Sequence, residues 1–171
     1  MGTKRVGLAR VEALIENLKR ELVLGAGSSL AGAMRKIKAV SSATTLTEAD
    51  SGCIVDISGA DYVIKLPQDP TAGCTFTFVN TAALGAGGSV NIDAKDGEEF
   101  FKGPIMDLEN ADGSAQLANG TSHDQVKFAA SAGAKDTVIT CTFIGGNTWL
   151  IHDSYAIDES DVSLGTASTN A

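Results

Sequence analysis

From residue 40 to residue 156, apolar and polar positions alternate in short runs that Gly, Pro, Asp and Asn interrupt. A period of two is typical of strands with one buried face, and these interrupting residues are typical of turns. The pattern predicts a mainly β protein, an antiparallel β-sandwich with Greek-key or jelly-roll-like connections. The expected strands are residues 52–57, 62–66, 74–79, 89–93, 98–102, 125–129, 137–144 and 148–152.

The last two of these strands form the clearest predicted hairpin, with residues 145–147 as its turn. Ile139, Cys141 and Phe143 fall on one face of the first strand, because successive side chains of a strand point to opposite sides. We expect this face to point into the core and Trp149 to close that core.

Two stretches are expected to interrupt the strands. Gly103 and Pro104 follow residues 98–102, and proline cannot donate a hydrogen bond to a neighbouring strand. Residues 109–122 are polar and rich in small residues, which predicts a long loop that could reach a neighbouring molecule.

The N-terminal segment, residues 4–24, has a helical period instead. Its apolar positions are spaced three, four, three and four residues apart, as on one side of an amphipathic helix, and Leu14 widens the stripe. A helix of this length is marginal alone in water, so its apolar side needs a partner surface. That partner is either the chain's own domain or a sister subunit or larger assembly. The stripe consists of Leu8, Val11, Ile15, Leu18 and Leu22.

These patterns divide the chain into three parts. Residues 1–40 form a helical arm that continues into a Gly-rich hinge. Residues 30–38 are ambiguous, because Ala31 and Ala33 permit a helix whereas residues 35–40 could be a first edge strand. Residues 41–156 form the β-sandwich domain. Residues 157–171 are small, acidic and weakly patterned, which predicts a C-terminal tail.

Charge separates the arm from the body. Residues 1–40 hold eight Lys and Arg and three Glu, a net charge of +5, so the total of −8 leaves −13 for residues 41–171. A basic arm favours an acidic partner, whereas the acidic body is a poor binder of nucleic acid. The chain shows no secretory signal and no apolar run long enough to span a membrane.

Cys53, Cys74 and Cys141 are an odd number without C-x-x-C spacing, and each lies in an apolar run. We expect buried, reduced thiols, consistent with assembly in a cytoplasm.

No residue pattern indicates catalysis, a metal site or a cofactor. His123 and His152 have no Ser or Cys placed around them as in a catalytic triad. The acid pairs at residues 98–99 and 158–159 fit a solvated surface better than a glycosidase site. Residues 93–98 superficially resemble a calcium loop, but Lys95 interrupts them.

The chain nevertheless resembles a known class of proteins. Residues 1–10 and 14–22 are similar to the start of structural proteins from marine tailed bacteriophages, cyanophages in particular. The body resembles small β-domains of phage capsid decoration and fibre proteins. The motifs behind this second resemblance are residues 46–52, Leu66-Pro67, Gly73-x-x-Phe76-x-Phe78 and Gly146-Asn147-x-Trp149.

The resemblance implies a non-enzymatic virion protein on the capsid exterior, made in the host cytoplasm and often homotrimeric. The expected function is capsid decoration, in which the arm docks on the major capsid protein and the chain acts as a cement that stabilises the shell. The residues expected to bind this partner are Lys4, Arg5, Leu8, Arg10, Val11, Leu14, Ile15, Leu18 and Leu22.

Two alternatives remain open. The first is a tail-fibre or receptor-binding module whose β-domain contacts host glycan. The second is a carbohydrate-active enzyme that uses acid pairs such as Glu98 and Glu99, although the exposed aromatic residues of a sugar platform are scarce in this sequence.

Overall fold

The structure is a computed structural model that describes residues 11–12, 35–82, 84, 88–108, 115–129, 135–157 and 161–166. It is mainly β, as predicted. The elements are β1 (Ile37–Val40), β2 (Thr44–Thr45), the 3₁₀ helix η1 (Glu48–Asp50), β3 (Ile54–Ile57), β4 (Tyr62–Lys65), β5 (Thr75–Asn80), β6 (Val90–Asp93), β7 (Phe100–Asp107), β8 (Ala115–Asn119), β9 (Gln125–Phe128), β10 (Val138–Phe143), β11 (Thr148–Ala156) and β12 (Val162–Gly165).

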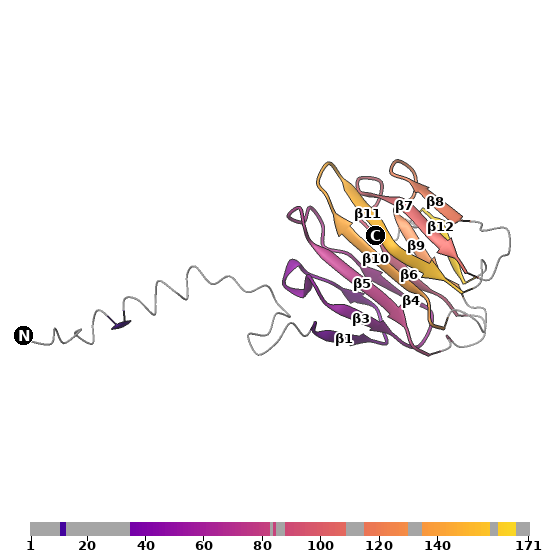
Figure 1. Cartoon of the computed structure of the whole chain (residues 1–171), viewed down its shortest axis with the longest axis horizontal. Helices are drawn as coiled ribbons and strands as arrows, with labels where there is room; N and C mark the ends of the chain where they lie inside the picture. The colour runs from indigo at the N-terminus through magenta and orange to yellow at the C-terminus, as the bar shows by residue number, and fades with distance from the viewer. Residues whose placement is uncertain are drawn as a thin grey trace, which may run out of the picture.

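The strands form two sheets, shown in Figure 1. One has seven strands in the order β1-β3-β5-β10-β11-β7-β8, and the other has five in the order β12-β9-β6-β4-β2. Up to β7 the chain passes from one sheet to the other after every strand, so that β1, β3 and β5 run parallel in the first sheet and β2, β4 and β6 run parallel in the second.

The prediction of a purely antiparallel arrangement is therefore wrong, because both sheets are mixed. Alternation along a strand reports which face is buried but not the direction of the neighbouring strand. Antiparallel pairs join β5 to β10, β10 to β11, β7 to β8, β6 to β9 and β9 to β12, whereas β7 and β11 are parallel.

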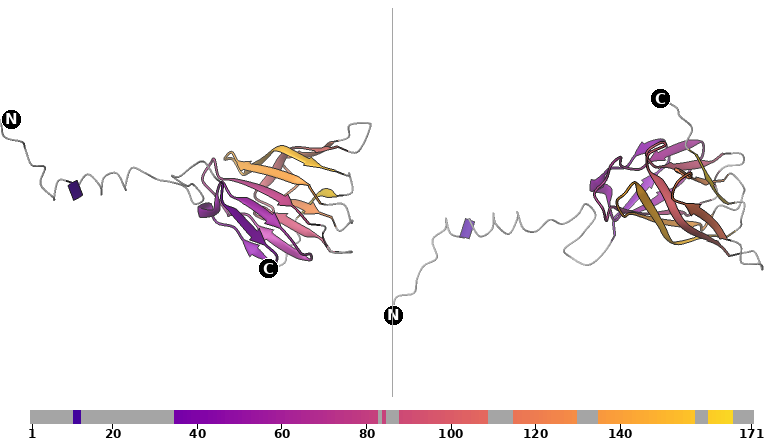
Figure 2. Two further views of the ribbon diagram at one scale, coloured as in Figure 1. Left: turned by 60° about the horizontal axis from the view of Figure 1, so that its bottom comes forward. Right: turned by 90° about the horizontal axis from the view of Figure 1, so that it is seen from above.

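One hydrophobic cluster connects the two sheets, which lie over one another in the views of Figure 2. It includes Phe76 and Phe78 from β5 and Val126 and Phe128 from β9, all fully buried. Trp149 is fully buried too, and its ring centroid lies 5.3 Å from that of Phe143.

The predicted hairpin is confirmed. Residues Val138–Phe143 pair with β11, and the three turn residues 145–147 all have positive φ. Ile139, Cys141 and Phe143 are buried as their alternation predicts. Cys53, Cys74 and Cys141 are free and buried, and burial raises the pKa of the Cys141 thiol, which makes it unreactive.

Three sequence predictions need correction. Gly103 and Pro104 lie inside β7 and do not end it, because the β7–β11 register shifts at this point. Residues 115–119 of the expected loop form β8, an edge strand. Residues 162–165 of the expected tail form β12, which pairs with β9 and buries Val162, so the body extends beyond residue 156.

The boundary between arm and body also moves. Residues 37–40 form β1 at the edge of the seven-stranded sheet, the edge strand that the sequence left open. Val11 and Glu12 have helical backbone geometry and are exposed. Residues 1–10 and 13–34, which include the other predicted partner-binding residues and the Gly-rich hinge, lie outside the described residues. No helix within the described part of the chain has the length and apolar character needed to cross a membrane.

Candidate functional site

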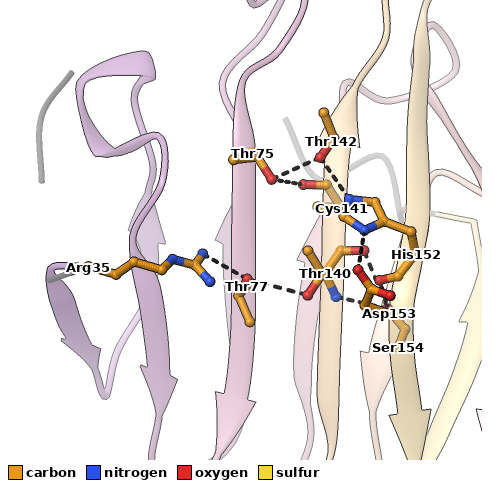
Figure 3. Close-up of polar contacts among 9 residues, drawn as sticks. All are labelled: Arg35, Thr75, Thr77, Thr140, Cys141, Thr142, His152, Asp153 and Ser154. Atoms are coloured by element: carbon orange, nitrogen blue, oxygen red, sulfur yellow. Dashed lines mark hydrogen bonds and ion pairs between the residues drawn. The ribbon is translucent and has the colours of Figure 1, made fainter. Parts of the chain in front are cut away.

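A polar network lies on the outer face of the seven-stranded sheet, across β5, β10 and β11 (Figure 3). Two Thr-x-Thr sequences lie side by side there, since Thr75 pairs with Thr142 and Thr77 with Thr140 across β5 and β10. The hydroxyl of Thr142 donates to Thr75 Oγ1 at 2.8 Å, and that of Thr140 donates to Thr77 Oγ1 at 3.3 Å. The network therefore joins neighbouring strands on the side away from the core.

One end of this network contains a hydroxyl, an imidazole and a carboxylate in series. Thr142 Oγ1 lies 2.9 Å from His152 Nε2, and His152 Nδ1 lies 3.1 Å from Asp153 Oδ2. The order of these groups is that of a nucleophile, its base and an orienting acid. The sequence did not reveal this arrangement because the hydroxyl comes from a different strand.

The hydrogen bonds nevertheless point away from catalysis. Thr142 gives its only hydroxyl proton to Thr75, which in turn donates to the Cys141 carbonyl at 3.1 Å. That proton is directed at Thr75 and not at His152 Nε2, whereas an activated nucleophile must give its proton to the base. This geometry supports a structural role in connecting β5, β10 and β11.

Arg35 occupies the other end of the network. Its Nε donates to the Gly52 carbonyl at 2.9 Å and its Nη2 to Thr77 Oγ1 at 2.8 Å. The guanidinium thus fastens the chain to β5 immediately before β1 begins.

In residues 93–98, the stretch that resembles a calcium loop, the positive charge is that of the Lys95 side chain. The Lys95 ammonium lies 2.7 Å from Glu98 Oε2 and 2.9 Å from Asp69 Oδ2, and the hydrogen bonds to these two carboxylates raise its pKa. Asp124 accepts the backbone N–H of Gly97 at 3.0 Å. Within the described ranges, no group of three or more His, Cys, Asp or Glu side chains could hold a metal ion.

The acid pair proposed for a glycosidase does not share a site. Glu98 is exposed beside Lys95, whereas Glu99 is buried. One carboxylate oxygen of Glu99 accepts the Trp149 indole N–H at 2.8 Å and the other accepts the Asp69 backbone N–H at 2.8 Å. Both oxygens hold the fold together, so the geometry gives this alternative no support. Asp158 and Glu159 lie outside the described residues.

Asp93 is a buried acid whose ionisation opposes folding. Burial raises the pKa of its carboxyl, the hydrogen bond from Gln125 at 2.9 Å lowers it, and Asp124 nearby raises it, with a net upward shift. A raised pKa in the folded state means that the folded chain loses stability as pH rises through that pKa.

Asp93→Asn is therefore expected to stabilise the protein at neutral pH by up to about 1 kcal/mol, because the amide oxygen still accepts from Gln125 but cannot ionise. This gain in stability should shrink at about pH 3.5, where the Asp93 carboxyl is largely protonated in both the folded and the unfolded wild type. Urea denaturation of the variant and the wild type at acidic and neutral pH measures the difference in their free energies of unfolding. An equal effect at both pH values would contradict the assignment.

Of the predicted arm residues, only Val11 lies in the described part of the chain, where it is 39% exposed. Comparison with models of known protein families, with curated proteins and with solved structures finds no match. The proposal below therefore depends on the residues and contacts of this chain.

Proposed function

We propose that the chain is a non-enzymatic virion structural protein, a capsid decoration protein whose arm docks on the major capsid protein at the shell exterior. The observation that carries the proposal is the exposure of Val11, the one residue of the predicted apolar stripe that the structure describes, which is 39% exposed. The core formed by the described residues runs from Val40 to Leu164. An apolar stripe on a helix needs a surface to cover it, and the proposed surface is that of the shell.

The distribution of charge also favours an arm that binds the shell and a body that faces the solvent. The arm is basic and the rest of the chain acidic, with the net charges +5 and −13 for residues 1–40 and 41–171. Lys4, Arg5 and Arg10 would contact acidic positions on the shell, while the acidic body keeps particles apart in solution. Arg35, which precedes β1, is itself held to the body through Gly52 and Thr77.

The finer description of the body belongs to the same proposal. Two facing sheets with a shared core are consistent with a β-sandwich with jelly-roll-like connections, and the copies are proposed to associate as a trimer. Binding to the assembled shell but not to its free subunits would stabilise the shell by mass action.

The test is a double substitution in the stripe, Ile15→Asp with Leu18→Asp, in the full chain. Two charges on the apolar side should abolish binding to purified particles while the body stays folded and soluble. The control is Ala13→Asp with Asn17→Asp, which adds the same charge on the opposite side of the predicted helix and should retain binding.

Binding is measured by cosedimentation with particles that lack the protein. Full occupancy by the stripe variant would refute the docking role. Labelled protein found only at the tail would instead support the receptor-binding alternative.

A further inference from the structure

Exposed apolar side chains gather at one end of the seven-stranded sheet. Eight large hydrophobic residues are exposed among the described residues, and five of them lie on or directly after β7, β8 and β11. Together with exposed Pro104 they form what we call the β7–β8 apolar face. Its members are Pro104, Met106, Leu108, Leu117, Tyr155 and Ile157.

The strand register places these side chains on one side of the sheet. Pro104 pairs with Leu117, and Met106 pairs with Tyr155. The residues between them, such as Ile105 and Ala118, are buried in the core, so the exposed partners point outward.

The same ladder continues beyond the ends of β7 and β11. The Leu108 N–H donates to the Ala156 carbonyl at 3.0 Å, which brings Leu108 and Ile157 beside Met106 and Tyr155. Leu117 is 68% exposed and Leu108 59% exposed. Three adjacent strands with this spacing place the six side chains together in a patch about 10 Å by 13 Å.

The outward positions of β7 and β8 carry none of the acids that dominate the body, although Asp153 of β11 is exposed two residues before Tyr155. The described outward positions of β7 and β8 are Lys102, Pro104, Met106, Ala115, Leu117 and Asn119. They include no carboxylate, although residues 41–171 carry a net charge of −13. A basic partner would be drawn to the acidic remainder of the surface and not to this face.

The strand at this edge also lacks the usual protection against pairing. β8 reads Ala-Gln-Leu-Ala-Asn, without a charged residue or a proline, whereas β1 at the opposite edge includes Lys38. Monomeric proteins commonly place charges or proline on such edges to prevent sheets from associating.

We propose that the β7–β8 apolar face is where copies of this chain associate with one another. Two bodies of net charge −13 repel each other least where they meet over surfaces poor in acids, and the outward positions of β7 and β8 carry no acid. Leu117 and Tyr155 are the anchors, since each offers a large apolar side chain to the sister copy. This face would be the contact through which the copies of the decoration protein associate. Only the number of copies, three, rests on the proposed function.

The first experiment measures the molar mass of the full chain by light scattering coupled to gel filtration, without particles present. The wild type should elute as an oligomer, and Met106→Glu with Leu117→Glu should reduce it to the 17.5 kDa monomer. Circular dichroism checks that the variant is folded. The matched control is Ile144→Glu, because Ile144 is 53% exposed at the β10–β11 turn, and this variant should keep the oligomeric mass.

A second variant decides the matter if the double substitution does not fold. Leu117→Cys places one accessible thiol on the face, while the three native cysteines are buried. A short bifunctional maleimide should link two copies of this variant, and should not link Ile144→Cys. A wild type that is monomeric at every concentration, an oligomer that survives Met106→Glu with Leu117→Glu, or a failure of Leu117→Cys to cross-link overturns the proposal.

These outcomes separate the inference from the docking role of the arm. The Ile15→Asp, Leu18→Asp variant should keep its oligomeric mass even if it no longer binds particles. Loss of mass in that arm variant would show that the arm holds the copies together and would overturn the inference. A monomeric wild type whose particle binding depends on Leu117 would assign the face to the shell protein instead.

Discussion

Glu99→Ala is expected to lower the free energy of unfolding by about 3–5 kcal/mol. The substitution removes both acceptors of a buried carboxylate at once. The Trp149 indole N–H, which lies in a fully buried ring, loses its partner at 2.8 Å, and the Asp69 backbone N–H loses its own. Hydrogen bonds to charged groups contribute about 1.5–3 kcal/mol each, so two of them account for the expected loss.

Chemical denaturation monitored by tryptophan fluorescence measures this effect directly, because Trp149 is the only tryptophan. Glu98→Ala is the matched control. It removes a neighbouring carboxylate that is exposed and pairs with Lys95 on the surface, so its cost should stay below about 1 kcal/mol. Equal losses for the two variants would show that the Trp149 contact contributes little.

A double-mutant cycle with Trp149→Phe isolates the contact between the two side chains. Phenylalanine keeps most of the ring but has no N–H to donate, so Glu99→Ala should cost less in that background by about 1 kcal/mol or more. Additive effects would contradict a direct interaction. A large coupling would support a structural role for Glu99 in place of the catalytic role considered from the sequence.

The features that the sequence predicted correctly depend on neighbouring residues. The hairpin follows from strict alternation on both sides of residues 145–147, and the burial of Cys141 and Trp149 follows from the same alternation. These features need only the period of one strand and the chemistry of one turn.

The features that it missed depend on distant partners. The parallel pairing of β1, β3 and β5 leaves no mark on the alternation of any single strand. β12 has only Val162 and Leu164 as apolar positions and becomes a strand because β9 lies beside it. Glu99 looked like a surface acid, since nothing local indicates that Trp149 lies 2.8 Å from its carboxylate.

Of the two candidate binding surfaces, one could be predicted from the sequence and the other could not. The apolar stripe of the arm is visible from spacing alone, and its docking role stays a prediction. The β7–β8 apolar face could not be found by pattern, because Pro104 argued against a strand and the small polar residues around Leu117 argued for a loop. Only the register of β7 with its two neighbours brings these side chains together.

Gly103 makes this arrangement possible, and Gly103→Ala is expected to cost about 3 kcal/mol or more of the free energy of unfolding. The residue has φ of 130°, which side chains rarely allow, and an added Cβ would lie 2.3 Å from the Ile151 carbonyl oxygen. That oxygen belongs to the backbone of β11, so the strain can be relieved only if β7 and β11 move apart.

The control is Gly97→Ala, where φ is 66° but no heavy atom lies within 4 Å of the added Cβ. Backbone strain alone should cost about 1–2 kcal/mol there, and denaturation curves of the two variants give the difference. Similar losses would show that the contact with Ile151 is relieved without moving the strands. Since Pro104 and Met106 follow Gly103 on β7, separating β7 from β11 should also weaken self-association, which connects the local backbone at Gly103 to the proposed contact between copies.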